Sequence, residues 1–307
     1  MLNATGHTAI TDKDASCLAL GDTTFISAPP PAARAAATKP QSKAELNHGG
    51  PDANATSSAD AALSVEAASS ANAPSSAGAA GAAIAATLKL LNDCLAPQRR
   101  VVHAGDCIYQ AGERFADLHI LHSGFVKIVN LSADGREQVV GLKFRGDWLG
   151  FDGLASGRYA CDAVAMDTGE VWVFKYADFV TACLNQPVLL TKLHEAMSRE
   201  IAHNRDSLMS VCTLPADARV ANFLRYWVQA LALRGLRTDH ITLRMTRAEI
   251  GNYLGMTLET VSRALSKLAR DNVIAFNEKG RREVHIPDVA ALSAFTRRCV
   301  EAHATIQ

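Results

Sequence analysis

The stretch TRAEIGNYLGMTLETVSR, residues 246–263, decides the fold of the C-terminal part of this 307-residue chain. The tripeptide GMT divides it, and each half carries apolar residues at helical spacing. These apolar positions, continued a few residues beyond the stretch, are Ile250, Leu254, Leu258, Val261, Leu265 and Leu268. Each half therefore has one face to bury, which predicts two short helices joined by a tight turn.

The residues at the helix ends suit such a turn. Thr246 is a good N-cap for the first helix, and Glu249, three residues later, completes a capping box. Gly255 supplies the positive φ that the turn requires. Thr257 can cap the second helix.

The exposed face of the second helix carries side chains that can read DNA. Glu259, Ser262 and Arg263 are spaced i, i+3 and i+4, so they share one face. In the major groove an arginine can donate two hydrogen bonds to guanine, and a glutamate can accept one from the amino group of cytosine. We predict that these three residues read base edges while the first helix braces the second.

Other residues of the helix pair are predicted to contact phosphates, which give affinity without sequence information. They are Thr246, Arg247, Thr257, Thr260, Lys267 and Arg270. A helical hairpin that binds no DNA can have the same pattern. Local charge favours DNA, because residues 215–286 hold twelve Lys and Arg against seven Asp and Glu, whereas the whole chain has a formal net charge of zero.

Composition argues against several classes of protein. The seven cysteines are widely spread without a CxxC pair, which argues against a disulfide framework and a compact zinc site. No run approaches the roughly 20 apolar residues that cross a bilayer. Asp12 and Asp14 lie where a secretory signal would be apolar, so we expect a cytoplasmic protein without membrane contact. We find no P-loop, nucleophile elbow, HExxH or dinucleotide fingerprint and do not expect an enzyme.

The N-terminal part has two sections of different texture. Residues 1–84 are rich in Ala, Ser, Pro and Asn and cannot bury enough apolar surface to offset their ordering entropy, so we predict a disordered tail. Residues 85–184 begin with a helical pattern and continue as short alternating or β-branched segments punctuated by glycine. This section is predicted to be an antiparallel β-barrel or jelly roll.

Residues 185–213 have the spacing of a coiled-coil helix. The predicted seam consists of Leu190, Met197, Ile201, Asn204, Leu208 and Val211. Two such helices would pair in a homodimer, where a buried Asn204 would fix the register. A single amphipathic helix lying on the barrel is the alternative.

Residues 214–307 read as helix, strand, the two helices of the turn, and a hairpin with basic residues at its tip. The helix that precedes the strand ends at Gly235. The strand is DHITLRM, and the hairpin is NVIAFNEKGRREVHIP. This order is that of a winged helix-turn-helix. The fold class is therefore α+β, with a β-roll sensor, a long dimerisation helix and a C-terminal DNA-binding domain.

From about Leu88 to its end, the chain resembles the CRP/FNR superfamily of bacterial transcription regulators, most specifically in MTRAEIGNYLGMTLETVSRALSKLARDNVI. The stretch is similar to the FNR and FixK branch, because Leu258 and Ser262 stand where the CRP branch has Arg and Gly. The resemblance implies a cytoplasmic activator-type regulator that binds a near-palindromic, TTGAT-like operator as a homodimer through Glu259, Ser262 and Arg263. It also implies RNA polymerase as a partner.

The sensor resembles the family's β-roll but departs from its ligand-binding residues. Cyclic-AMP binders carry a Glu and an Arg-Ser pair where this chain has Phe151 and Tyr159–Ala160. The alternative is that Arg158, one residue away, serves as a displaced phosphate ligand. Iron–sulfur members need four cysteine thiolates. Here only Cys94 lies near the first group, and Trp172 takes the place of the fourth. We expect neither cAMP nor a cluster.

Weaker candidates for sensing are single thiols and imidazoles. The thiols are Cys94, Cys107, Cys161, Cys183 and Cys212, any of which could be redox-sensitive but is more often a small buried apolar residue. Haem could take a ligand from His103, His119, His122, His194 or His203. The rival function is a nucleotide-binding or redox-responsive module that acts on a protein partner.

Overall fold

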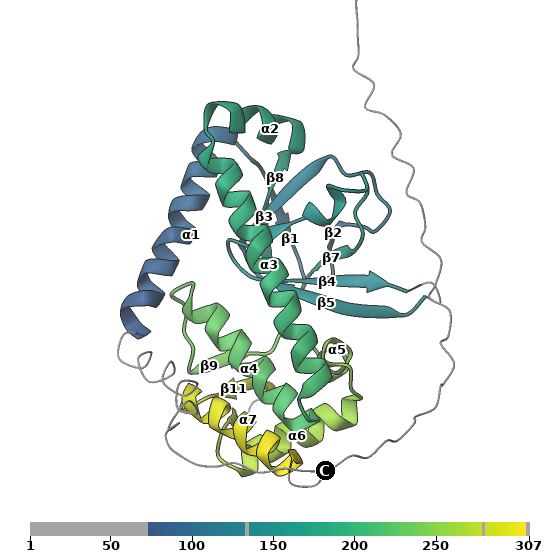
Figure 1. The fold of residues 1–307 in the computed structure, drawn as a ribbon, viewed down its shortest axis with the longest axis vertical. Helices are drawn as coiled ribbons and strands as arrows, with labels where there is room; N and C mark the ends of the chain where they lie inside the picture. The colour runs from purple at the N-terminus through teal and green to yellow at the C-terminus, as the bar shows by residue number, and fades with distance from the viewer. Residues whose placement is uncertain (1–72, 133–134, 278–279, 305–307) are drawn as a thin grey trace, which may run out of the picture. The chain divides into compact units, whose positions relative to one another are not determined.

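The computed structural model describes residues 73–132, 135–277 and 280–304, so most of the predicted tail lies outside the described residues. Among the described residues, the first part of the fold comprises one α-helix, eight strands and a short 3-10 helix at Phe151–Gly153 (Figure 1). The α-helix and the strands are α1 (Ala73–Leu95), β1 (Gln98–Val102), β2 (Cys107–Tyr109), β3 (Asp117–Ser123), β4 (Val126–Leu131), β5 (Glu137–Lys143), β6 (Trp148–Leu149), β7 (Asp162–Ala165) and β8 (Gly169–Lys175). The predicted boundary between the tail and the sensor, at residue 84, falls inside α1.

The eight strands form two four-stranded sheets, ordered β1-β8-β3-β6 and β2-β7-β4-β5, in which neighbouring strands are antiparallel. Alternation along β3 shows how the sheets are buried. Leu118 and Ile120 belong to the cluster on the helix side, whereas Leu121 belongs to the cluster between the sheets. The sheet β1-β8-β3-β6 is therefore covered on both faces, and the predicted antiparallel β-roll is confirmed.

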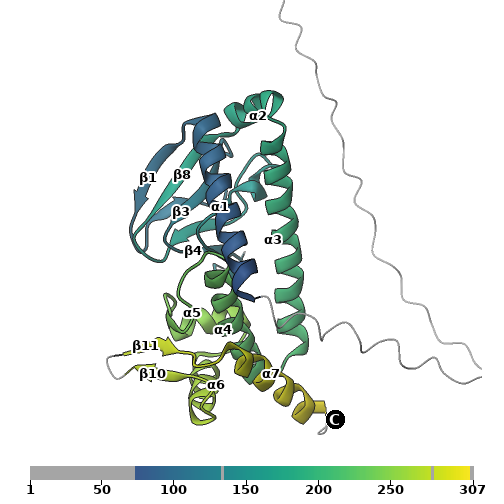
Figure 2. The same cartoon turned by 90° about the vertical axis from the view of Figure 1, so that its left-hand side faces the viewer.

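Three helices cover that outer face (Figure 2). They are α1, α2 (Tyr176–Asn185) and α3 (Val188–Thr213). Leu91 of α1, Phe179 of α2 and Leu189 of α3 are each at most 1% exposed and pack with Trp172 of β8. None of the described helices is long and apolar enough to cross a membrane.

The long helix α3 uses only part of its apolar surface within the chain. Leu189 and Leu193 are buried against the β-roll, as the single-helix interpretation required. On the predicted seam, however, Leu190, Ile201 and Leu208 are 43%, 49% and 64% exposed. One side of α3 thus lies on the sensor, and another side presents large apolar side chains to the surface.

The C-terminal part contains α4 (Ala216–Ala232), β9 (His240–Thr242), α5 (Arg247–Leu254), α6 (Leu258–Arg270), β10 (Ala275–Asn277), β11 (Gly280–His285) and α7 (Val289–Ala304). The three strands form an antiparallel sheet ordered β10-β11-β9. The predicted winged helix-turn-helix is therefore present. The helix α7 was not predicted; it packs on α4 and buries Leu292 and Phe295.

Gly251 in α5 is required by a close approach of backbone atoms at the turn. A Cβ at this position would lie 2.6 Å from the carbonyl oxygen of Met256 and 3.3 Å from the carbonyl carbon of Thr257. Because both are backbone atoms, no side-chain rotation can relieve the clash. Spacing along the sequence did not predict a role for this glycine.

We expect Gly251→Ala to destabilise the DNA-binding domain by about 1–3 kcal/mol, since the two helices must move apart. Urea unfolding followed by tryptophan fluorescence measures the loss. Gly78→Ala is the matched control, because Gly78 lies in α1 with open space around its Cβ position, and alanine there should stabilise by about 0.5–1 kcal/mol. Equal stability of Gly251→Ala and the unaltered chain would contradict the packing described.

Candidate nucleic-acid interface

Both helices of the turn begin at the predicted caps. The Oγ1 atom of Thr246 accepts a hydrogen bond from the backbone N–H of Glu249 at 3.2 Å, and Glu249 Oε2 accepts one from the Thr246 N–H at 2.7 Å. Thr257 Oγ1 accepts from the Thr260 N–H at 3.3 Å. Gly255 ends α5 with φ 64°. The capping box, the left-handed glycine and the second cap are all confirmed.

The three predicted base-reading residues lie together on the outside of α6. Glu259 and Arg263 are exposed and Ser262 is half-buried, while the opposite face buries Val261 and Leu265. Hydrogen bonds from its own backbone N–H and from Thr257 hold the pKa of the Glu259 carboxyl below its ordinary value. The face thus presents an ionised acceptor and a guanidinium donor from one turn of helix.

Most of the predicted phosphate-contacting side chains are already engaged within the protein. Lys267 Nζ lies 2.7 Å from a carboxylate oxygen of Asp217 in α4. The Arg247 guanidinium lies 5.3 Å from the centre of the Phe276 ring in β10. The hydroxyls of Thr246, Thr257 and Thr260 take part in hydrogen bonds at the helix starts. Arg270 is exposed at the end of α6.

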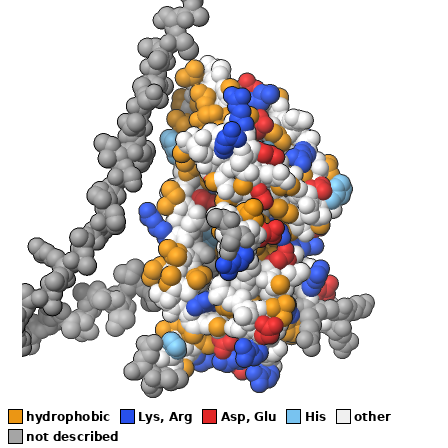
Figure 3. Space-filling view, turned by 90° about the vertical axis from the view of Figure 1, so that its right-hand side faces the viewer, with side chains coloured by type: hydrophobic (Ala, Val, Ile, Leu, Met, Phe, Trp, Pro, Cys, Tyr) orange, Lys and Arg blue, Asp and Glu red, His pale blue; other side chains and the backbone are white. Residues whose placement is uncertain are grey.

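Several Lys and Arg side chains lie at the end of the protein that holds α6. Arg263 forms no ion pair with any residue that the structure describes; its Nη2 is 3.4 Å from Thr260 Oγ1. Lys and Arg side chains gather at the lower end of the surface in Figure 3, at the level of α6 and α7 in Figure 1. On the wing, Arg282 is exposed. Exposed guanidinium groups of this kind attract the DNA backbone.

The helix α5 is also held by the β-roll, through residues that the sequence analysis missed. The side-chain amide of Asn252 donates to the carbonyl of Glu137 at 2.6 Å and accepts from the N–H of Val139 at 2.5 Å. The side chain of Gln138 donates in return to the Asn252 carbonyl. Because β5 is an edge strand, Asn252 satisfies backbone groups that would otherwise lack a strand partner.

An ion pair strengthens this contact between the sensor and the DNA-binding domain. Lys127 of β4 pairs with Glu249, the capping-box residue of α5. Burial alone would raise the pKa of the Glu249 carboxyl, but hydrogen bonds from Lys127 and Thr246 outweigh it and hold the pKa below its ordinary value. Periodicity could not reveal these contacts, since more than a hundred residues of sequence separate the partners.

The core between the two sheets of the β-roll contains two buried tyrosine rings among mainly aliphatic side chains. The ring of Tyr159 is 5% exposed and stacks on Tyr109 with a 4.1 Å centroid distance. Its hydroxyl donates to the carbonyl of Asp117 at 2.7 Å. Burial lowers the pKa of the neighbouring His119 to about 4, so that imidazole is neutral at pH 7. The cluster is closely packed and uncharged.

The loop around these rings offers little to a phosphate group. The N–H of Ala160 donates to the carboxylate of Asp152 at 2.9 Å. This N–H is therefore already bonded to an anion and is not available to a phosphate oxygen. Arg158, the alternative phosphate ligand, donates instead to the carbonyl of Gly112 at 2.6 Å. The residues present do not fit a cyclic nucleotide bound in the usual way.

The other sensor candidates are similarly engaged. Trp172 donates its indole N–H to Glu170 at 2.6 Å and stacks on His122 at 4.6 Å. Burial raises the pKa of the Cys161 thiol to about 11, and it also raises the pKa of Cys107, Cys183 and Cys299. A raised thiol pKa lowers the thiolate fraction and hence reactivity. The structure brings no four thiolates together among the described residues.

Comparison with known families finds two matching domains. Residues 218–295 match a Crp-like helix-turn-helix domain, and residues 99–186 match a cyclic nucleotide-binding domain. The first match covers the C-terminal helices and the wing, and the second covers the β-roll. The second match describes the β-roll architecture, whose interior in this chain holds the aromatic cluster.

The chain matches individual relatives over most of their length. The chain is 31% identical over 200 residues to the transcriptional regulatory protein btr of Bordetella pertussis, covering 65% of this chain and 83% of the relative. It is 29% identical over 205 residues to the fumarate and nitrate reduction regulatory protein of Salmonella typhimurium, covering 67% and 82%. The solved structure of FixK2 from Bradyrhizobium japonicum matches with a TM-score of 0.58 and 28% identity, covering 64% of this chain and 96% of that one.

We expect Asn252→Ala to expose the backbone of β5 and weaken the attachment of α5. The Val139 N–H is partly buried and the Glu137 carbonyl is exposed, so leaving both without this partner should cost about 1 kcal/mol or somewhat more. Hydrogen exchange measures this directly, because the Val139 amide should exchange roughly tenfold or more faster. Amides of β3, in the other sheet, serve as the internal control. Unchanged protection of Val139 would show that the Asn252 contact does not form in solution.

Proposed function

The chain belongs to the CRP/FNR family of DNA-binding transcription regulators, and from that premise we propose that it reads a near-palindromic, TTGAT-like operator as a homodimer. The observation that carries the proposal is the outer face of α6, where Glu259, Ser262 and Arg263 stand together. An arginine and a glutamate one turn apart match the guanine and cytosine of one half-site. By family resemblance we propose a cytoplasmic activator that contacts RNA polymerase.

The exposed side of α3 supports the dimer. Leu190, Ile201 and Leu208 belong to a seam whose residues are three, four or seven positions apart, and they have large exposed fractions. A second copy of α3 would cover them. A two-fold axis along such a pair places two copies of α6 about one helical turn of DNA apart, which corresponds to an inverted repeat in the operator.

The sensor supports a signal other than cAMP or an iron–sulfur cluster of the usual kind. We infer this from the residues that stand in the two sites. In the nucleotide site, Tyr159 stacks inside the β-roll and Asp152 accepts the hydrogen bond of the Ala160 N–H. In the cluster site, Trp172 stands where iron–sulfur members have their fourth cysteine, and its indole N–H is bonded to Glu170. The redox alternative is disfavoured for Cys161, whose thiol is protonated at neutral pH.

Leu208→Asp is expected to dissociate the dimer, because a carboxylate in a helix seam has no partner and costs several kcal/mol to desolvate. Sedimentation velocity measures the mass. Leu184→Asp is the matched control, since Leu184 is 80% exposed in α2, outside the predicted seam. A Leu208→Asp variant that still sediments as a dimer would contradict the seam, as would loss of the dimer in both variants.

Arg263→Ala is expected to weaken binding to a TTGAT-N4-ATCAA duplex by about 1–3 kcal/mol and to relax the choice at one base pair. Electrophoretic titrations against this duplex and a scrambled one, at fixed salt, measure both effects, and repeats with reductant, oxidant and cAMP test the signal. Arg270→Ala is the control: it should weaken binding to both duplexes alike and lower the salt slope by about one.

If the chain acts only on a protein partner, Arg263→Ala leaves its activity intact and neither duplex is preferred. Selective binding by the unaltered chain, lost in Arg263→Ala, supports the base-reading role. Selective binding that Arg263→Ala leaves unchanged overturns that role.

A further inference from the structure

The sheet at the base of the wing brings together three residues to which the sequence analysis assigned no role. In the antiparallel pair β9–β11, His240 lies directly opposite His285. Side chains that face each other in this way project from the same side of a sheet, with Cβ atoms about 4.5–5.5 Å apart. The two imidazole rings have a centroid distance of 4.4 Å and an angle of 44° between their planes.

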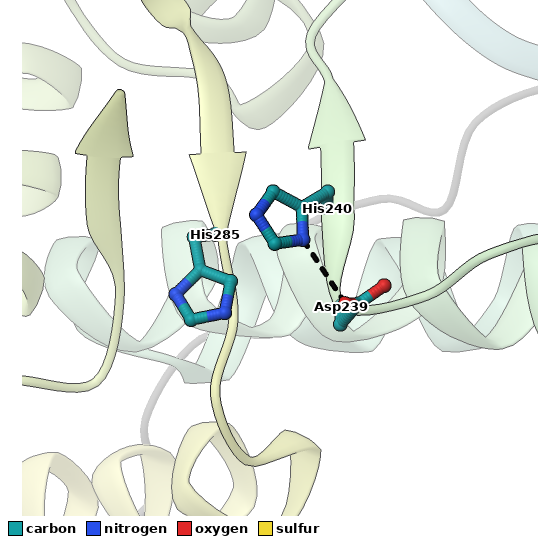
Figure 4. Close-up of side chains that lie close together, drawn as sticks. All are labelled: Asp239, His240 and His285. Atoms are coloured by element: carbon teal, nitrogen blue, oxygen red, sulfur yellow. Dashed lines mark hydrogen bonds and ion pairs between the residues drawn. The ribbon is translucent and has the colours of Figure 1, made fainter. Parts of the chain in front are cut away.

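A carboxylate completes the group (Figure 4). Asp239 precedes β9, and its backbone carbonyl accepts a hydrogen bond from the N–H of Ile286 at 2.8 Å, which fixes it beside β11. Its Oδ2 atom lies 3.0 Å from His240 Nδ1. One nitrogen from each histidine and one oxygen of Asp239 all lie within 4.8 Å of one another. We refer to Asp239, His240 and His285 as the wing-base cluster.

The ligand set is chemically specific. Two imidazoles and a carboxylate, with a fourth position open to water, suit tetrahedral Zn²⁺. Imidazole nitrogen also favours the neighbouring ions Co²⁺, Ni²⁺ and Cu²⁺. Mg²⁺ and Ca²⁺ prefer six or more oxygen ligands, which this cluster does not supply. A donor–donor spread of 4.8 Å is somewhat wider than tetrahedral coordination needs, but small side-chain rotations at the surface can close it.

A positively charged side chain already faces two of the donors. The Arg237 guanidinium donates to Asp239 Oδ1 at 2.6 Å and to Oδ2 at 2.8 Å, and its Nη2 lies 3.1 Å from His240 Nδ1. These hydrogen bonds hold the pKa of the Asp239 carboxyl well below its ordinary value, so the carboxylate is ionised. Arg237 is 69% exposed, and an exposed ion pair contributes little stability. Arg237 can therefore leave for solvent.

We propose that the wing-base cluster binds one late first-row divalent cation of the Zn²⁺ class, with Arg237 as a competing internal cation. The bound ion joins β9 to β11. Those strands connect directly to the parts that meet DNA, because β9 leads to the cap of α5 at Thr246 and β11 forms one side of the wing. Binding to the folded state alone also raises stability in proportion to the logarithm of ion concentration.

The test is a titration of the metal-free full-length chain with Co²⁺, followed by displacement with Zn²⁺. The seven cysteines of the chain are the main competitors. They are distinguishable, because thiolate ligation to Co²⁺ produces a charge-transfer absorption that a nitrogen and oxygen site lacks. We expect one Co²⁺ per chain with ligand-field bands but without that absorption.

Four variants make the result decisive. His240→Ala and His285→Gln should each lose this binding, and Arg237→Gln should bind Co²⁺ roughly threefold or more tightly because the competing cation is gone. His103→Ala is the matched control, since His103 is likewise exposed, with Nδ1 3.5 Å from a carboxylate oxygen of Asp106, but belongs to no such cluster among the described residues. Circular dichroism of each metal-free variant checks its fold.

Ligand-field bands that persist in His285→Gln, or weaker Co²⁺ binding by Arg237→Gln, would overturn the proposal. The wing-base cluster does not depend on the operator assignment. Its readout is metal binding without DNA, so its failure leaves the proposed function untouched.

Discussion

The aromatic contact between the β-roll and α4 is the interaction on which the arrangement of the two domains depends. Trp227 of α4 is 1% exposed, and its ring lies 5.3 Å from Phe144 and 5.7 Å from Phe125 of the sensor. Burying each such side chain contributes about 1.5–3 kcal/mol. The same cluster continues through α4 to Val261 and Leu265 of α6. Sensor and recognition helix thus share one continuous core.

Polar contacts fix the orientation that this core leaves open, because apolar burial has no direction. The side-chain amide of Asn252 pairs with the edge of β5, and Lys127 reaches the carboxylate that caps α5. A displacement of the β4–β5 hairpin would therefore pull on the first helix of the turn. This edge and the aromatic core both join the sensor to the DNA-binding helices.

The charges of the C-terminal domain are divided between internal pairs and free groups. Lys267 is neutralised by Asp217, and Arg237 by Asp239, whereas Arg263 remains available on the outer face of α6. The net charge of the chain is zero, so electrostatic attraction to DNA depends on the local excess of positive charge in the C-terminal domain and on where its exposed guanidinium groups lie. The wing-base cluster adds a place where an external cation could change that local balance.

Sequence alone determined the elements whose signals are local. The capping box at Thr246, the left-handed Gly255 and the apolar faces of α5 and α6 follow from spacing within a few residues, and the glycine-punctuated segments predicted the β-roll. The family resemblance rested on the same local stretch. The termini of the elements were less predictable: α1 begins at Ala73, and α7 was not foreseen although it packs against α4.

Tertiary structure decided everything that depends on partners distant in sequence. Asn252 meets Val139, His240 meets His285, and Tyr159 stacks on Tyr109 only because strand register and domain packing bring them together. The apolar pattern of α3 likewise did not show which side of the helix is buried. The structure shows that Leu189 and Leu193 pack against the β-roll, whereas the seam side remains exposed. Periodicity records which residues prefer burial or a given backbone angle, whereas contacts across a hundred residues depend on the geometry of the folded chain.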